Sequence, residues 1–89
     1  MMMVQKDAFE ELTGLQWVRS GGKATCHGQW HLMIDGEHKG TVFHCGHPTA
    51  NYPYYGQLVG TDTMRLAPNG RGFRLLKDAQ ADLLAAAGI

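Results

Sequence analysis

The sequence predicts an α+β fold, with a three- to four-stranded antiparallel sheet packed against a C-terminal helix and a short N-terminal helix. Two patterns predict it. Apolar and polar residues alternate over 30–35, as in a strand with one apolar face, and, after a stretch of turn residues, the segment 41–45 resumes the strand. Further along, residues ~75–87 carry an apolar stripe at helical spacing, so this segment is expected to form a helix that covers the apolar face.

The length and charge of the chain limit the classes of protein it can belong to. Its 89 residues predict a single domain, 1–89, with one core. Eight basic and eight acidic residues cancel, so the chain lacks the positive field that favours nucleic-acid binding. No apolar run approaches the roughly 20 residues that span a bilayer, and the N-terminus has no signal-peptide core. Two cysteines are too few for a disulfide framework. We therefore expect a cytoplasmic protein with no membrane partner.

The remaining elements follow from spacing and turn residues. Residues 4–13 have apolar positions at helical spacing, which predicts a short N-terminal helix. Alternation over 15–19 predicts a first strand, and 57–61 and 64–66 are weaker strand candidates. Gly88 directly follows the C-terminal helix, where a glycine commonly ends a helix.

The turn of the hairpin decides which side chains share a face of the sheet. A two-residue turn at 35–36 would place the charged Glu37 and Lys39 opposite the apolar Ile34 and Leu32. A longer loop avoids this mismatch. We therefore expect the two strands to be joined by four residues.

The four-residue loop, 36–39, pairs Trp30 with Cys45 and His31 with His44. Directly opposed residues share a face of an antiparallel pair. The indole and the thiol are therefore expected beneath the C-terminal helix, and the two imidazoles on the exposed face.

The crowding of histidine and cysteine between residues 26 and 47 raises the question of zinc. A structural site needs four nitrogen or sulfur ligands that converge on one point. The expected register divides these residues between two sides of the sheet, so we expect neither a metal nor any other cofactor. A structural zinc domain remains an alternative, with Cys26, Cys45 and His47 as its ligands.

Cys45, between His44 and His47, is the candidate for a catalytic nucleophile. Such a thiol needs a base within hydrogen-bond distance, but neighbours along a strand point to opposite faces. Paired carboxylates, a phosphate loop and a nucleophile elbow are all missing from the sequence. We expect no enzyme activity and assign no catalytic residue.

The segment 46–56 is rich in proline and tyrosine and predicts a loop that binds a partner protein or stacked bases. The alternative is that its tyrosines complete the core. The binding interpretation predicts that Tyr54→Ala changes partner binding more than stability. The candidate binding residues, from this loop and from the expected exposed face, are His31, His44, His47, Asn51, Tyr52, Tyr54 and Tyr55.

A local basic patch near the last turn is the basis for a nucleic-acid alternative. Acidic neighbours dilute this patch, which favours a solvated face over a binding site. The candidate nucleic-acid-binding residues are Arg65, Arg71, Arg74 and Lys77.

Two motifs carry resemblances to known groups of proteins. The run HCGHPTANYPYY at 44–55, followed by GRGFRLLKDAQADL at 70–83, resembles small uncharacterised proteins of phages and prophages of proteobacteria. This resemblance spans roughly 30–84 and implies a phage or prophage origin and a bacterial host cytoplasm. It implies no reaction, ligand or partner. The pattern Gly-Phe-x-x-Leu-x-x-Ala-Gln after the strands looks like AP2-type β-β-β-α DNA-binding domains, which read DNA from a basic sheet face.

These observations lead to three functional hypotheses. The first is a non-enzymatic protein-interaction module that acts on a host or phage protein. The second is a small accessory protein that binds DNA or RNA with an AP2-like arrangement. The third is the structural zinc domain.

Overall fold

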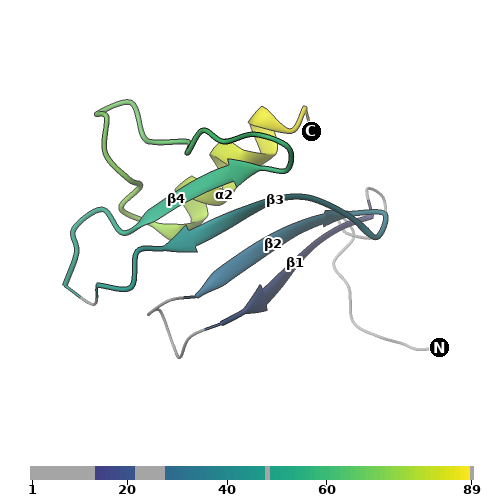
Figure 1. The fold of residues 1–89 in the computed structure, drawn as a ribbon, viewed down its shortest axis with the longest axis horizontal. Coiled ribbons are helices and arrows are strands. Elements are labelled where there is room, and N and C mark those ends of the chain that lie inside the picture. Colours follow the sequence, from purple (N-terminus) through teal and green to yellow (C-terminus); the bar gives the residue numbers. More distant parts are fainter. Residues whose placement is uncertain (1–13, 22–27, 48, 89) are drawn as a thin grey trace.

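The computed structural model describes residues 14–21, 28–47 and 49–88. These residues form one antiparallel sheet with strand order β1-β2-β3-β4, followed by a single helix, α2 (Figure 1). The predicted α+β class is confirmed, whereas the helix predicted at 4–13 lies outside the described residues. The elements are β1 Leu15–Ser20, β2 Gln29–Ile34, β3 Glu37–His44, β4 Tyr54–Leu58 and α2 Leu76–Ala86.

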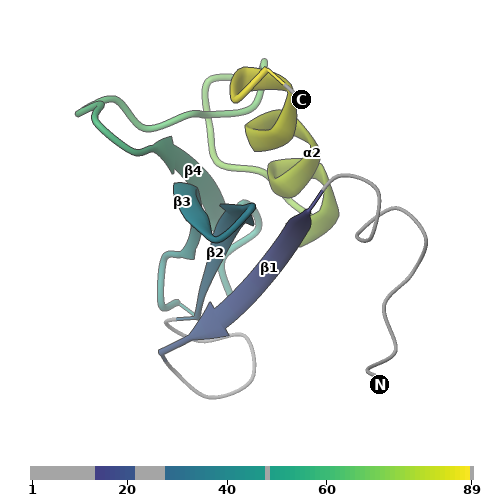
Figure 2. The ribbon, with the colours of Figure 1, turned by 90° about the vertical axis from the view of Figure 1, so that its right-hand side faces the viewer.

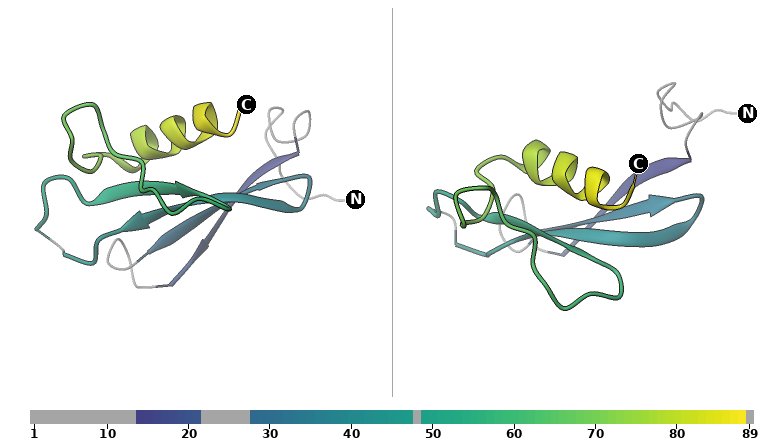
Figure 3. Two further views of the ribbon diagram at one scale, coloured as in Figure 1. Left: turned by 45° about the horizontal axis from the view of Figure 1, so that its top comes forward. Right: turned by 90° about the horizontal axis from the view of Figure 1, so that it is seen from above.

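Helix α2 lies on one face of the sheet, against β3 and β4 (Figure 2, Figure 3). The C-terminal helix predicted at ~75–87 is therefore confirmed. Its end is also as predicted, because Gly88 has a positive φ of 84° and its N–H donates to the carbonyl of Ala85. No helix of the described residues is both long and apolar enough to cross a bilayer.

The hairpin between β2 and β3 differs from the prediction. Its turn contains only two residues, Asp35 and Gly36, and Ile34 pairs directly with Glu37. Both turn residues have a positive φ, 51° and 81°, which is the geometry whose twist suits adjacent antiparallel strands. The predicted four-residue loop is therefore wrong.

A β-bulge removes one of the two mismatches that argued against the short turn, the one between Lys39 and Leu32, whereas Glu37 remains opposite Ile34. The pairing steps from Met33–His38 to Leu32–Gly40, so Lys39 has no direct partner in β2. The bulge lets a glycine, and not the lysine, lie opposite Leu32. The Lys39 ammonium instead forms an ion pair with Glu37, with 2.9 Å between Nζ and Oε1.

The bulge also reverses which side chains of β3 face the helix. Trp30 pairs with Val42 and not with Cys45, a shift of three residues, and an odd shift exchanges the two faces. Val42 and His44 are therefore buried on the helix side, whereas Cys45 is exposed. The predicted placement of the thiol beneath the helix and of His44 on the exposed face is wrong.

Strand β4 begins earlier than predicted. It starts at Tyr54, within the predicted loop at 46–56, and ends at Leu58, short of the predicted 57–61. Tyr54 pairs with both His44 and Phe73, which provides hydrogen-bonding partners on both sides of this strand. The weaker candidate at 64–66 is reduced to one isolated bridge, between Arg65 and Gly56.

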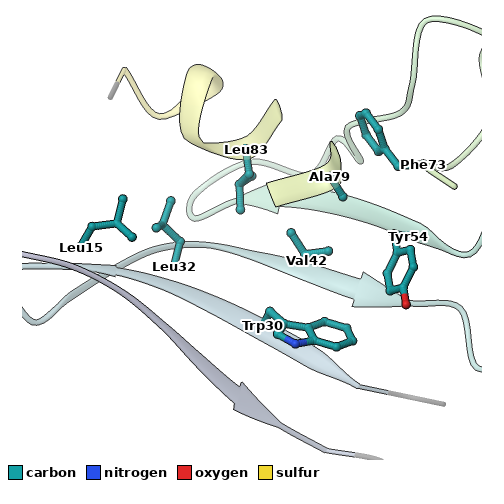
Figure 4. Close-up of a cluster of buried hydrophobic side chains, with 8 residues drawn as sticks. All are labelled: Leu15, Trp30, Leu32, Val42, Tyr54, Phe73, Ala79 and Leu83. Atoms are coloured by element: carbon teal, nitrogen blue, oxygen red, sulfur yellow. The ribbon is translucent and has the colours of Figure 1, made fainter. Parts of the chain in front are cut away.

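The core lies between the sheet and α2, and Leu83 is at its centre with no exposed surface (Figure 4). Glycines at Gly40 of β3 and Gly56 of β4 let this side chain approach the sheet closely. The buried apolar residues are Leu15, Trp30, Leu32, Val42, Tyr54, Phe73, Ala79 and Leu83.

Gly40→Ala is expected to lower the free energy of unfolding by about 1–3 kcal/mol because it overpacks this contact. A Cβ at position 40 would come within 2.9 Å of the Gln57 carbonyl oxygen and 3.0 Å of Leu83 Cδ2. Urea denaturation measures the loss. Gly56→Ala is the matched control, because its Cβ would lie 3.3 Å from Leu83 Cδ1 and is expected to cost less. Equal stability of both variants and the wild type would contradict this close packing.

Candidate functional site

The face of the sheet opposite α2 gathers polar, apolar and aromatic side chains from all four strands. We call it the open face. Its pairing positions follow from the observed register, in which opposed residues point the same way. None of the side chains at these paired positions is an aspartate, glutamate, lysine or arginine, and the bulged Lys39 forms an ion pair with Glu37. The open face consists of Gln16, Val18, Ser20, Gln29, His31, Met33, His38, Thr41, Phe43, Tyr55 and Gln57.

A chain of hydrogen bonds crosses the open face from β1 to β3. Ser20 Oγ lies 2.7 Å from His31 Nε2, and His31 Nδ1 lies 3.0 Å from Thr41 Oγ1. His38 Nε2 lies 2.8 Å from the same hydroxyl oxygen and 2.9 Å from the carbonyl oxygen of Gly40. The two imidazole rings meet edge to face, with centroids 5.2 Å apart. We call Ser20, His31, Thr41 and His38 the imidazole–hydroxyl chain.

Counting protons assigns a direction to this chain. The carbonyl of Gly40 only accepts, so His38 carries its proton on Nε2 and donates it. Thr41 accepts from His38, and its own proton then has His31 Nδ1 as its acceptor. His31 therefore carries its proton on Nε2 and donates it to Ser20. The Nε2 proton of His38 is shared between two acceptors, the Gly40 carbonyl and the Thr41 hydroxyl, whereas the protons of Thr41 and of His31 Nε2 each have one acceptor.

The environment of the chain favours a neutral His31. Thr41, at its centre, is only 6% exposed although it lies on the open face. Burial first, and the nearby charge of His38 second, lower the pKa of His31. The imidazole of His31 is therefore neutral over a wider pH range than that of an isolated histidine.

An aromatic pair and a hollow adjoin the chain. The rings of Phe43 and Tyr55, on β3 and β4, stack with centroids 6.0 Å apart, and both side chains are half-buried. Beside Phe43 the surface is hollowed by about 290 Å³, between the open face and the turn at 59–61. The lining residues are His38, Thr41, Phe43, Gln57, Leu58, Val59, Gly60 and Thr61.

The predicted binding residues of the 46–56 segment do not form one surface. Tyr54 is buried at 9% exposure, with its ring edge to face with Trp30, whereas Tyr55 lies on the open face. Tyr52 is exposed, and the guanidinium of Arg71 lies 5.6 Å from its ring centroid. The remaining loop candidates, His47 and Asn51, are exposed.

The two predicted histidines of the hairpin are separated by the sheet. His31 is on the open face, as expected. His44 is 8% exposed on the helix side, where it lies edge to face with Tyr54 and accepts a hydrogen bond from the Gly46 N–H at Nδ1. Its burial removes it from the candidate surface.

The predicted basic residues are divided as well. Arg65 makes two hydrogen bonds to the carboxylate of Asp82 on α2, of 2.7 and 3.2 Å, which fasten the loop after β4 to the helix. Arg71 lies over Tyr52, and Arg74 and Lys77 are exposed. None of the four is on the open face.

The alternative zinc ligands are not brought together in the part of the chain that the structure describes. Cys45 and His47 are exposed, and Cys26 is outside the described residues. Among the described residues, no three histidine, cysteine, aspartate or glutamate side chains come close enough to hold a metal ion.

Among the open-face residues that form the hydrogen-bond chain and the aromatic pair, the sequence interpretation missed Ser20, His38, Thr41 and Phe43. His38 was assigned to a loop, and Thr41 and Phe43 were assigned to the buried face because the bulge was not foreseen. The correct register would have placed Thr41 directly opposite His31, with Ser20 diagonal to His31, since Ser20 pairs with Gln29.

Comparisons of the chain with protein-family models, curated proteins and solved structures found no match.

Proposed function

We propose that this protein is a non-enzymatic interaction module, and that the open face binds an uncharged segment of a host or phage protein. The observation that carries the proposal is the stacked pair of Phe43 and Tyr55 on a sheet face that α2 leaves uncovered. Aromatic side chains contribute large contact area at low entropic cost and are enriched in protein interfaces. The hydroxyls and imidazoles beside the pair supply directional hydrogen bonds.

The lack of charged side chains at the paired positions of the open face supports a protein partner over a nucleic acid. Phosphate binding depends on lysine and arginine; neither occupies a paired position of this face, and the bulged Lys39 is already paired with Glu37. Of the basic residues considered for nucleic acid, Arg65 is already paired with Asp82. An uncharged partner segment meets no unpaired charge here, so association carries no cost of burying one.

The direction of the imidazole–hydroxyl chain supports binding over catalysis. Ser20 and His31 are at the distance of a nucleophile and its base. A base must accept the serine proton, however, and the proton count makes His31 Nε2 a donor to Ser20. With this tautomer of His31, Ser20 accepts a hydrogen bond and is not activated as a nucleophile, which supports the interaction module.

Val18→Lys is expected to reduce recovery of the partner at least tenfold, because it places an unpaired charge on the open face. Val18 is 44% exposed in β1, so the change leaves the core intact. The measurement is capture from a proteobacterial lysate, with and without phage infection, on the immobilised protein, followed by quantitative mass spectrometry.

Leu66→Lys is the matched control. Leu66 is 47% exposed and lies outside the open face, so the variant has the same added charge and is expected to bind like the wild type. Circular dichroism establishes that both variants are folded. A partner recovered equally by the wild type and Val18→Lys would contradict the proposal. Retention of nucleic acid alone, weakening steeply with salt, would favour the nucleic-acid alternative.

A further inference from the structure

The imidazole–hydroxyl chain is the only place among the described residues where two histidines share one hydrogen-bonding group. It spans the open face from β1 to β3 and adjoins both the aromatic pair and the hollow. A change in its protonation therefore alters the surface that the proposed function uses.

We propose that the imidazole–hydroxyl chain is a proton-operated switch of the open face. When the chain is neutral, its hydrogen bonds link β1, β2 and β3, and the face binds its uncharged partner. When the two histidines are both protonated, the chain loses its central hydrogen bond and the face becomes cationic, so binding weakens. This inference rests on the proposed function for its consequence, but not for its chemistry.

The proton count explains why protonation of His31 breaks the hydrogen-bond chain. A cationic His31 carries a proton on Nδ1 and can no longer accept from Thr41. The Thr41 oxygen would then face two N–H donors, from His31 and His38, and its own proton would lose its acceptor. An unsatisfied buried hydroxyl costs free energy, so the side chains must rearrange.

Among the described residues, no aspartate or glutamate occupies a paired position of the open face to compensate the new charges. The side chains of β1 that face His31 are Val18 and Ser20, and the remaining titratable groups on this face are His38 and the phenol of Tyr55. At the hairpin turn, Glu37 is already paired with Lys39 at 2.9 Å. Two imidazolium rings with centroids 5.2 Å apart also repel each other.

The lowered pKa of His31 has the sign that a switch of this kind requires. A histidine whose pKa falls on folding adds stability above its unfolded value of 6.5, and that stability is lost as the pH drops through the folded pKa. His31 is therefore neutral at neutral pH, and its protonation occurs on the acid side of 6.5.

A pH titration of the ¹⁵N-histidine-labelled protein by NMR tests the switch without a partner. At pH 7.5 we expect the Nε2–H tautomer at His31, and a midpoint for His31 below 6.5. Thr41→Ala removes the donor that stabilises neutral His31 and is expected to raise this midpoint, and Thr41→Ser is expected to restore it. His38→Gln, which removes the neighbouring charge, is also expected to raise it.

His47→Gln is the control, because His47 is exposed in the loop and makes no contact with the chain. It is expected to leave the His31 midpoint unchanged. An Nδ1–H tautomer at His31, or the same midpoint in the wild type, Thr41→Ala and His38→Gln, would overturn the proposal.

Partner recovery at pH 7.5 and 5.5 then tests the consequence. Recovery of the partner by the wild type is expected to fall at least fivefold at the lower pH. Recovery by the His31→Gln, His38→Gln double variant is expected to fall less than twofold. An equal fall in partner recovery for the wild type and the double variant would overturn the proposal that the chain regulates binding. If the titration behaves as expected but Val18→Lys binds every captured protein as the wild type does, the proposed function fails and the proton chemistry stands.

Discussion

Trp30→Ala is expected to lower the free energy of unfolding by about 3–5 kcal/mol, the usual cost of truncating a large buried aromatic residue. Trp30 is 8% exposed and occupies the helix side of β2 beside Val42. Its ring lies edge to face with Tyr54, at a centroid distance of 5.8 Å, and beneath the guanidinium of Arg19 at 5.4 Å. Removing the indole therefore leaves a cavity and takes away two ring contacts.

Urea denaturation followed by circular dichroism measures this loss without relying on tryptophan fluorescence. Trp17→Ala is the control, because Trp17 lies on the same face in the edge strand β1 but is only half-buried. We expect a smaller loss there. A loss below about 1 kcal/mol for Trp30→Ala, well under the range for buried aromatic residues, would refute its place in the core.

Tyr54→Ala is expected to have a comparable effect on stability, again about 3–5 kcal/mol by analogy with other large aromatic residues. The side chain is 9% exposed and its ring contacts both Trp30 and His44, with centroids 5.8 and 5.1 Å away. This expectation reverses the one drawn from the sequence, which assigned Tyr54 to a binding loop. Tyr54 instead begins β4 and packs in the core.

Tyr52→Ala provides a closely matched control two residues away. Tyr52 is 39% exposed and its ring has Arg71 over it, a contact of roughly 0.5–1 kcal/mol at an exposed site. Its removal is expected to change the melting temperature only slightly. A melting temperature that falls equally in the two variants, or more in Tyr52→Ala, would contradict the placement of Tyr54 in the core.

The position of the C-terminal helix could be predicted because its signals are local. Apolar residues at helical spacing mark 76–86, and Gly88 ends the helix with the positive φ that glycine adopts without strain. The first strand, β1, was equally accessible from its alternation. Such patterns depend only on residues that are close in the sequence, so they can be recognised without knowledge of the rest of the chain.

The face of β3 could not be predicted, because its sequence fits both orientations. Thr41, Val42 and Phe43 are all suited to a strand, so period-two alternation does not say which of them is buried. The prediction of the buried face therefore depended on the length of the turn. A two-residue turn followed by a regular ladder would have placed Lys39 opposite Leu32. A single bulged residue removed that conflict and exchanged the two faces.

The wrong orientation predicted for β3 also made part of the predicted binding site wrong. His31 was correctly placed on the face away from the helix, since β2 alternates clearly between apolar and polar residues. His44 was expected beside it and is instead buried next to Tyr54. The hydrogen bonds from Ser20 through His31 to Thr41 depend on strand pairing, which the sequence of a single strand does not specify.

By itself, the sequence determined the α+β class, the C-terminal helix and its end, the first strand and the lack of net charge. Only the tertiary structure decided which side chains meet on the open face. The physical reason is that the spacing of side chains along one strand is set by local backbone geometry. The register between strands instead depends on which alternative pairing buries the more apolar face. In this sheet, burial of Leu32 and Val42 under Leu83 outweighs the regularity of the ladder.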